Sequence, residues 1–253
     1  MTGRSSIELF VAGAGPAYTD RPSATGAAYL LRAAGSAILL DFGQGSFPRL
    51  AAEIEPSTLD AVIVSHLHPD HFIDLVPLRH YLRYQLDPPR RMRVVGPAAL
   101  AERLDALHGE TGFTAASLDV RSVAEAGETI GSFAVEARRV THTDSSFAFR
   151  VSVHSDAGLV YSGDCGNAED LVGLIKPGDT LLAEVSFGPG PVPPGAQHLD
   201  GPAVGRLAAA TGASRVLLTH ILMGFDPEET LASVRASFRG EVSFVWPGDR
   251  LTV

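Results

Sequence analysis

The segment Ser65–His71, which reads Ser-His-Leu-His-Pro-Asp-His, constrains this chain more than any other part of the sequence. It continues an apolar run that predicts a buried β-strand. Directly after a strand, His66 and His68 can point to one side while Asp70 and His71 begin the next turn, so one short loop can serve two adjacent cations. This mixture of imidazole and carboxylate donors favours zinc, with manganese, iron or cobalt as alternatives. The opposing interpretation is a polar loop with a chance cluster of histidines.

The pattern of apolar residues predicts a β-rich mixed fold. It predicts strands at Ser6–Ala12, Ala27–Arg32, Ala37–Phe42, Leu59–Ser65, Leu159–Ser162, Thr180–Val185, Arg215–Thr219 and Val242–Trp246, with more strand between Leu118 and Tyr161. It predicts helices at Pro48–Ile54, His71–Tyr84, Ala98–Leu107, Glu169–Ile175, Gly201–Ala210 and Glu228–Phe238. Both halves contain strands and helices, so we expect two packed sheets with helices outside. No linker is long enough to divide the chain, and we expect one domain over residues 1–253.

The composition excludes several classes of protein. The formal net charge of −9 and the pI near 5.4 provide no general attraction to nucleic acid or anionic membranes. The one cysteine, Cys165, excludes an intrachain disulfide and favours a reducing compartment. No apolar run approaches the roughly 20 residues that span a bilayer, and the N-terminus lacks a signal-peptide pattern. We therefore expect a cytoplasmic protein that does not bind membranes.

Two pairs of similar segments place further polar residues at strand ends. Leu39–Gly43 resembles Val160–Asp164, and Val62–His66 resembles Val216–His220. In each segment an apolar strand ends on a polar residue that can bind a metal. Because sites in open α/β sheets form beyond the carboxyl ends of strands, we expect these residues to lie on one rim.

The Ser65–His71 segment resembles the HxHxDH motif of the metallo-β-lactamase superfamily. Other segments extend the likeness over most of the chain: Asp41 before Phe42-Gly43, His142 after Val140-Thr141, Asp164 after Ser162-Gly163, and His220 after Leu218-Thr219. Their order and spacing match those of the superfamily. The resemblance implies an α+β fold, an αββα four-layer sandwich with two mixed β-sheets and helices on the outside.

The resemblance also implies a centre with two zinc ions. The first metal would bind His66, His68 and His142, the second would bind Asp70, His71 and His220, and Asp164 would bridge the two. Water held between two cations has a lowered pKa and becomes a nucleophile near neutral pH. Asp70 is counted among the catalytic residues as well as the ligands, and Asp41 would orient ligands rather than bind metal. Histidine rather than glutamate at position 68 argues against the di-iron redox branch of the superfamily.

Glu184 and His198 form a second signal. A carboxylate at the end of the apolar run 180–183 is costly to bury unless it is paired or points into a site. This stretch resembles the ribonuclease Z-like branch, in which a histidine paired with a glutamate acts near the scissile phosphate. By that resemblance His198 would protonate the leaving oxygen, and Glu184 would orient it and raise its pKa. The alternative is that His198 is a loop residue and Glu184 a helix-capping or surface group.

Several departures from ribonuclease Z argue against tRNA processing. The residues after His198 are not the small hydroxyl pair usual in that family, and the run after His142 lacks its glycine-tyrosine-arginine sequence. The interval from His142 to Asp164 predicts a hairpin, with Phe147–Val153 as one strand, its turn at Asp156–Gly158 and Leu159–Ser162 as the other strand. This leaves no room for a tRNA-gripping arm. The loop Gly188–Gly195 contains no lysine or arginine. The sequence resembles short relatives, among them bacterial cyclic-nucleotide phosphodiesterases.

We therefore expect a dinuclear hydrolase, most simply a phosphodiesterase in which a metal-bridging hydroxide attacks a small phosphodiester such as a cyclic nucleotide. The alternatives are a 3′ tRNA-processing or other nucleic-acid-end nuclease, a thioester, lactone or β-lactam hydrolase, and a non-catalytic protein that retains metals for sensing. Extended nucleic acid is disfavoured as a partner, and a homodimer is left open. The five arginines between Arg79 and Arg93 could steer phosphate, lie on a solvated helix face or form a dimer contact.

Overall fold

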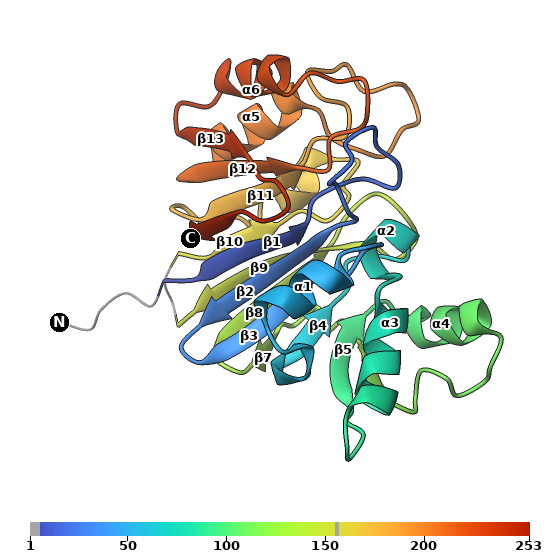
Figure 1. Cartoon of the computed structure of the whole chain (residues 1–253). Helices are drawn as coiled ribbons and strands as arrows, with labels where there is room; N and C mark the ends of the chain where they lie inside the picture. Colours follow the sequence, from blue (N-terminus) through green and yellow to red (C-terminus); the bar gives the residue numbers. More distant parts are fainter. Residues whose placement is uncertain (1–5, 155–156) are drawn as a thin grey trace.

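Two seven-stranded sheets pack against each other in the part of the chain that the computed structural model describes, residues 6–154 and 157–253 (Figure 1). The first sheet contains, in order, β14 (Arg250–Thr252), β1 (Glu8–Gly13), β2 (Ala28–Ala33), β3 (Ser36–Leu40), β4 (Ala61–Ile63), β5 (Met92–Gly96) and β6 (Leu118–Ser122). The second contains β13 (Glu241–Phe244), β12 (Arg215–Thr219), β11 (Thr180–Glu184), β10 (Leu159–Tyr161), β9 (Phe147–Val153), β8 (Phe133–Arg139) and β7 (Glu128–Ile130).

Each sheet combines antiparallel and parallel pairs in the same way. In the first sheet, strands from β14 to β3 pair antiparallel, and strands from β3 to β6 pair parallel. In the second, β7 to β10 pair antiparallel and β10 to β13 pair parallel. The antiparallel pair β9–β10 is the hairpin predicted between His142 and Asp164, although part of its predicted turn, Asp156, lies outside the described residues.

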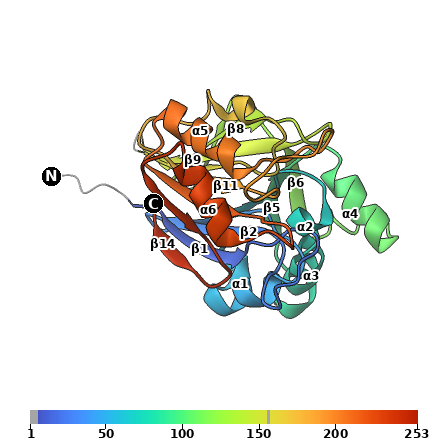
Figure 2. The same ribbon diagram turned by 90° about the horizontal axis from the view of Figure 1, so that it is seen from above.

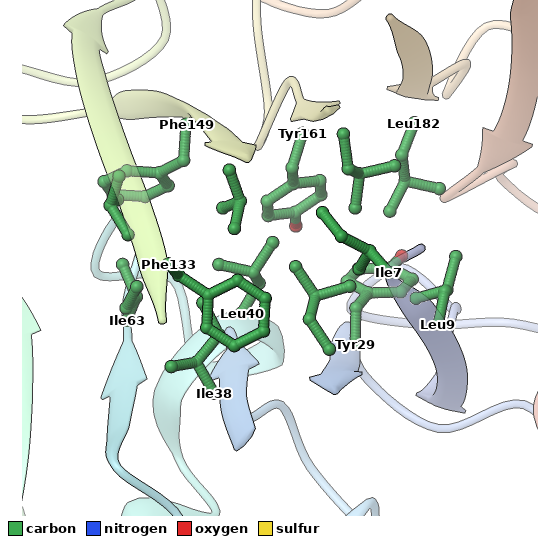
Figure 3. Packing of buried hydrophobic residues seen from close by; sticks show 14 of the residues in the cluster. Ile7, Leu9, Tyr29, Ile38, Leu40, Ile63, Phe133, Phe149, Tyr161 and Leu182 are labelled. Carbon is green, nitrogen blue, oxygen red and sulfur yellow. The ribbon is translucent and has the colours of Figure 1, made fainter. Parts of the chain in front are cut away.

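Apolar side chains alternate between the two faces of each sheet, as the period of two in a strand requires. Ile38 and Leu40 of β3 point into the space between the sheets, whereas Leu39 points toward the outer helices. Leu217 of β12 points inward in the same way, and Val216 points outward. Figure 3 shows both sheets meeting in this inner layer, through Ile7, Leu9, Tyr29, Ile38, Leu40, Ile63, Phe133, Phe149, Tyr161 and Leu182. Removal of this apolar surface from water stabilises the fold by about 25 cal/mol per Å².

Helices cover the outer face of each sheet (Figure 2). Apolar residues of α1 (Phe47–Glu53), α2 (Pro69–Phe72), α3 (Leu75–His80) and α4 (Leu100–His108) share one buried cluster with the outer face of the first sheet. Residues of α5 (Gly201–Thr211) and α6 (Pro227–Arg235) do the same for the second sheet. The predicted αββα four-layer sandwich is therefore confirmed. Among the described residues, no helix has both the length and the apolar character needed to cross a membrane.

The prediction of one continuous helix over His71–Tyr84 is wrong. The structure divides this stretch among α2, α3 and a π-helical turn at Tyr81–Gln85. The break falls at Asp74, whose carboxylate accepts a hydrogen bond from the backbone N–H of Phe47 at 2.7 Å. Because proline has no N–H and clashes with the preceding turn, the chain starts a new helix in which Pro77 occupies the first turn.

Two shorter elements also differ from expectation. The helix predicted at Glu169–Ile175 is a 3₁₀ turn at Ala168–Leu171, and Gly173 lowers the helix propensity beyond it. Strand β14 is not predicted, since its three residues gain strand geometry only by pairing with β1 at the edge of the first sheet.

Candidate metal centre

The site residues predicted from the sequence lie in segments that leave both sheets at one edge. His66 and His68 follow β4, Asp70 and His71 lie in α2, His142 lies between β8 and β9, Asp164 follows β10, Glu184 ends β11, His198 lies between β11 and α5, and His220 follows β12. The structure brings all of these residues together, as the distances below show. The two sheets therefore contribute to one cluster.

His66, His68, His142 and Asp164 form the first group of donors. His68 Nδ1 lies 3.0 Å from His66 Nε2 and 3.0 Å from His142 Nε2. Asp164 Oδ2 lies 3.7 Å from His66 Nε2 and 3.6 Å from His142 Nε2. Four donor atoms at these separations can surround one small cation, because metal–donor bonds to nitrogen and oxygen are about 2 Å long.

Asp70, His71 and His220 form the second group. His220 Nε2 lies 3.2 Å from His71 Nε2 and 3.2 Å from Asp70 Oδ2. The other oxygen of Asp164, Oδ1, lies 3.3 Å from His71 Nε2 and 3.5 Å from His220 Nε2. Asp164 thus presents one carboxylate oxygen to each group, which is the arrangement that a bridging ligand requires.

The carboxylate of Asp164 shows that these groups fit metal ions. Its Oδ1 is buried and has no hydrogen-bond partner among residues 6–154 and 157–253, which is costly unless a ligand satisfies it. Burial raises the pKa of this carboxyl, but His220 and His71 hold it well below its ordinary value, so the group is ionised. Burial lowers the pKa of His66 well below its ordinary value, which keeps a ring lone pair available. The donor set suits divalent metal ions.

Asp41 orients the cluster without belonging to either group. Its Oδ2 accepts hydrogen bonds from His71 Nδ1, the Ser65 hydroxyl and the Tyr161 hydroxyl, each at 2.7 Å. Because Asp41 holds the proton of His71 on Nδ1, Nε2 is left to face the second group. The φ angle of Asp41 is 57°, a conformation that is uncommon for a residue with a side chain. An orienting role was predicted for Asp41, and these hydrogen bonds have the geometry that such a role requires.

Two more histidine rings are held at their other nitrogen by groups that sequence reasoning missed. His142 Nδ1 donates to the backbone carbonyl of Gln197 at 2.7 Å, and His220 Nδ1 lies 3.1 Å from Ser186 Oγ. The sequence gives a weak indication of the role of Ser186, because it is a polar residue two positions after Glu184. The Gln197 contact could not be predicted from the sequence, since it uses the backbone carbonyl, which any residue could supply. Such partners fix the ring orientation of metal-binding histidines.

Glu184 and His198 form a pair beside the cluster. Glu184 is buried, and its Oε1 lies 3.1 Å from His198 Nδ1. Burial lowers the pKa of His198, but the hydrogen bond and the charge of Glu184 raise it, and the net pKa lies above its ordinary value. His198 Nδ1 also lies 3.8 Å from Asp164 Oδ2, and these residues with His220 form a third set of donors close enough to hold a metal.

The arginine-rich stretch does not contribute to these donor groups. Arg79 is buried, donates from Nε to the carbonyl of Phe113 at 2.9 Å, and lies 4.1 Å from the centroid of that ring. Arg93 pairs with Glu128. Arg79 therefore holds α3 against the segment that follows α4, which is a structural role.

The backbone of α2 packs closely against the loop after β3. A Cβ added at Gly43 would lie 1.8 Å from the carbonyl oxygen of Asp70, which also accepts the backbone N–H of Ala27 at 2.9 Å. We expect Gly43→Ala to displace α2, to destabilise the protein by about 1–3 kcal/mol and to weaken metal binding. Chemical unfolding and metal titration measure both effects.

Gly96→Ala is the matched control for this substitution. A Cβ there would lie 2.9 Å from the flexible end of the Leu100 side chain and 3.2 Å from the Cβ of Val64, so it adds crowding in the core without touching the backbone of α2. Equal metal affinities for the Gly43→Ala and Gly96→Ala proteins would contradict the expected displacement of α2.

Comparisons with known proteins agree with this geometry. Residues 38–221 match the family described as the beta-lactamase superfamily domain. The chain belongs to this superfamily. The uncharacterised Mycobacterium tuberculosis protein Rv1339 is 34% identical over 231 residues, which cover 88% of this chain and 84% of that protein.

The probable metallo-hydrolase YhfI of Bacillus subtilis is 26% identical over 232 residues, which cover 87% of this chain and 91% of that protein. The crystal structure of YhfI, described as a metallo-beta-lactamase fold protein, matches with a TM-score of 0.87 and 22% identity over 99% of this chain and 100% of that chain. The short form of human tRNase Z matches with a TM-score of 0.73 and 20% identity, covering 96% of this chain and 98% of that chain. These likenesses confirm the metallo-β-lactamase fold, and the relatives place the chain among metallo-hydrolases with ribonuclease Z-like members.

Proposed function

We propose that the protein is a metal-dependent phosphodiesterase that acts on small nucleotides, cyclic nucleotides first. The observation that carries this proposal is the pairing of His198 with Glu184 next to Asp164, the carboxylate that faces both donor groups. An alkoxide is a poor leaving group, so cleavage of a phosphodiester gains from a positioned acid. Hydrolysis of a thioester, a lactone or a β-lactam needs no second acid of this kind.

The proposal assigns a zinc ion to each donor group. His66, His68 and His142 would hold the first ion, Asp70, His71 and His220 the second, and Asp164 both. When bound, the two ions would lower the pKa of a water molecule between them and supply a nucleophile near neutral pH. Asp41 keeps His71 in the tautomer that this binding requires. Because both sheets provide ligands, the proposal also takes the chain as one functional domain.

His198 would donate a proton to the leaving oxygen. Its Nδ1 is engaged by Glu184, so Nε2 is the nitrogen left to face a substrate. The His198 side chain is 24% exposed, against 1% for Glu184, so a substrate can reach the imidazole but not the carboxylate. Glu184 would act as a positioning residue that fixes the ring and favours its protonated form.

The expected preference for small substrates follows from the short interval between His142 and Asp164, where a tRNA-gripping arm would have to be inserted. The segment from the start of β9 to the end of β10, residues 147–161, takes up most of the interval from His142 to Asp164, and the loop Gly188–Gly195 carries no cation. The net charge of −9 adds no hold on a polyanion. We expect cyclic AMP to be turned over with a higher kcat/KM than 3′-extended tRNA at one salt concentration.

The test is a screen of the zinc- and manganese-loaded protein on bis-p-nitrophenyl phosphate, cyclic nucleotides, 3′-extended tRNA, a thioester and a β-lactam. Turnover of phosphodiesters alone, with cyclic nucleotides ahead of tRNA, is the expected result. Faster specific cleavage of tRNA would move the protein into the tRNA-processing group, which its ribonuclease Z relatives make the second candidate. Turnover of only the thioester or the β-lactam would overturn the proposal.

A further inference from the structure

A groove opens beside His198, between the segment that follows Asp164 and helix α5. Its volume is about 450 Å³, within the range of about 300–1,000 Å³ that is usual for small-molecule sites. Val172, Leu207 and Ala210 give it an apolar wall. The groove is distinct from the two donor groups, because His198 is the one residue of the candidate centre among those that line it.

The position of His198 relates the groove to the reaction. His198 lines the groove, and its Nδ1 lies 3.8 Å from the bridging Asp164. A general acid must lie within hydrogen-bond reach of the oxygen that it protonates. In the proposed reaction the leaving oxygen therefore faces His198, and the groove is the space beyond it.

Three charged side chains besides His198 line the groove. Asp200 caps α5 by accepting the backbone N–H of Ala203 at 2.9 Å, and the other two are Glu169 and Arg206. Neither side chain has a hydrogen-bond or ion-pair partner among the residues that the structure describes. A nucleobase has two apolar faces and a polar edge, and the edge of adenine, guanine or cytosine combines ring or carbonyl acceptors with an exocyclic amino group. A guanidinium can donate to the acceptors, and a carboxylate can accept from the amino group.

We propose that this groove binds the base of the nucleoside that carries the leaving oxygen, with Arg206 and Glu169 reading its polar edge and Leu207 and Ala210 contacting one face. This inference rests on the proposed function, in which the substrate is a nucleotide. It adds that the preference for a nucleotide over a simple phosphodiester resides in α5 and in the 3₁₀ turn at Ala168–Leu171, outside the metal-binding residues.

The decisive experiment compares Ala210→Phe with Ala209→Phe. Both alanines are exposed on α5, but Ala210 lines the groove and Ala209 does not. We expect Ala210→Phe to raise the KM for cyclic AMP roughly tenfold or more, because the added ring occupies the surface on which the base packs. The kcat/KM for methyl p-nitrophenyl phosphate, which has no base, should stay at the wild-type value. Ala209→Phe should behave as wild type on both substrates.

Arg206→Leu gives an independent measurement on the polar edge. Loss of a hydrogen bond from a charged donor should raise the KM for cyclic AMP roughly tenfold or more. The kcat/KM for methyl p-nitrophenyl phosphate should not change. Arg239→Leu, at another exposed arginine that does not line the groove, is the control. Equal effects of Ala210→Phe and Ala209→Phe on cyclic AMP, or equal losses for both substrates, would overturn the proposed base site.

Equilibrium binding of AMP separates failure of this inference from failure of the proposed function. If no phosphodiester is turned over, the phosphodiesterase assignment fails, and calorimetry with AMP still tests the groove. Binding to the wild-type and Ala209→Phe proteins that is weakened in Ala210→Phe would support the base site. No binding of AMP to the wild-type protein, or equal binding to all three proteins, would exclude it.

Discussion

Asp164→Ala should remove both metal ions and with them the hydrolytic activity. Asp164 faces both donor groups, with Oδ2 3.6 Å from His142 Nε2 and Oδ1 3.3 Å from His71 Nε2. Metal content measured by elemental analysis should fall from close to two ions per chain to less than one. The loss of affinity should exceed the roughly 10–100-fold that results from removing a residue that only orients a ligand.

Two variants make this measurement specific. Asp41→Asn removes the charge that orients His71 but removes no metal-binding side chain. The Asp41→Asn protein should therefore retain more metal than the Asp164→Ala protein. Asp119→Ala removes an exposed carboxylate on β6 that is paired with Arg121, and it should leave metal content unchanged. Two bound ions in the Asp164→Ala protein would contradict the bridging arrangement. Absence of bound transition metal in the zinc-reconstituted wild-type protein would contradict the metal centre itself.

His198→Ala should lower phosphodiester turnover by roughly 10²–10⁴-fold, the usual contribution of a general acid. Metal content should stay near two, because each donor group is complete without this ring. The loss should shrink for p-nitrophenyl esters, since a good leaving group needs little protonation. Steady-state kinetics on cyclic AMP and on bis-p-nitrophenyl phosphate, with elemental analysis of the same samples, measure all three effects.

The alternative role for His198 is that of a metal ligand, since it forms a third set of donors with Asp164 and His220. A ligand role would appear as lost metal together with an equal loss on both substrates, and that result would exclude the acid role. His108→Ala is the matched control, because His108 is exposed, packs against Phe113 and belongs to none of the donor groups. It should change neither metal content nor turnover.

Much of the architecture follows from short-range patterns in the sequence. Strand β9 has the bounds predicted from its apolar run, Phe147–Val153, since every residue of that strand is buried. The segment Ser65–His71 likewise predicts a metal cluster, because a strand followed directly by three histidines and an aspartate has few other low-cost structures. The division of His71–Tyr84 could not be predicted in detail, because the helix break coincides with a hydrogen bond from the backbone N–H of the distant Phe47 to the Asp74 carboxylate.

The sequence by itself determined the types of donor, their order along the chain and the strand ends that carry them, because these depend on residue identity and local periodicity. The tertiary structure alone decided which atom of each donor faces which group. His68 presents Nδ1 whereas His66 and His142 present Nε2, and Ser186 and the Gln197 carbonyl hold rings that lie far from them in sequence. The groove beside α5 is likewise tertiary, since it exists only where residues of the 3₁₀ turn and α5 meet next to His198. Ring orientation and cavity shape depend on packing between distant segments, and no local pattern encodes that packing.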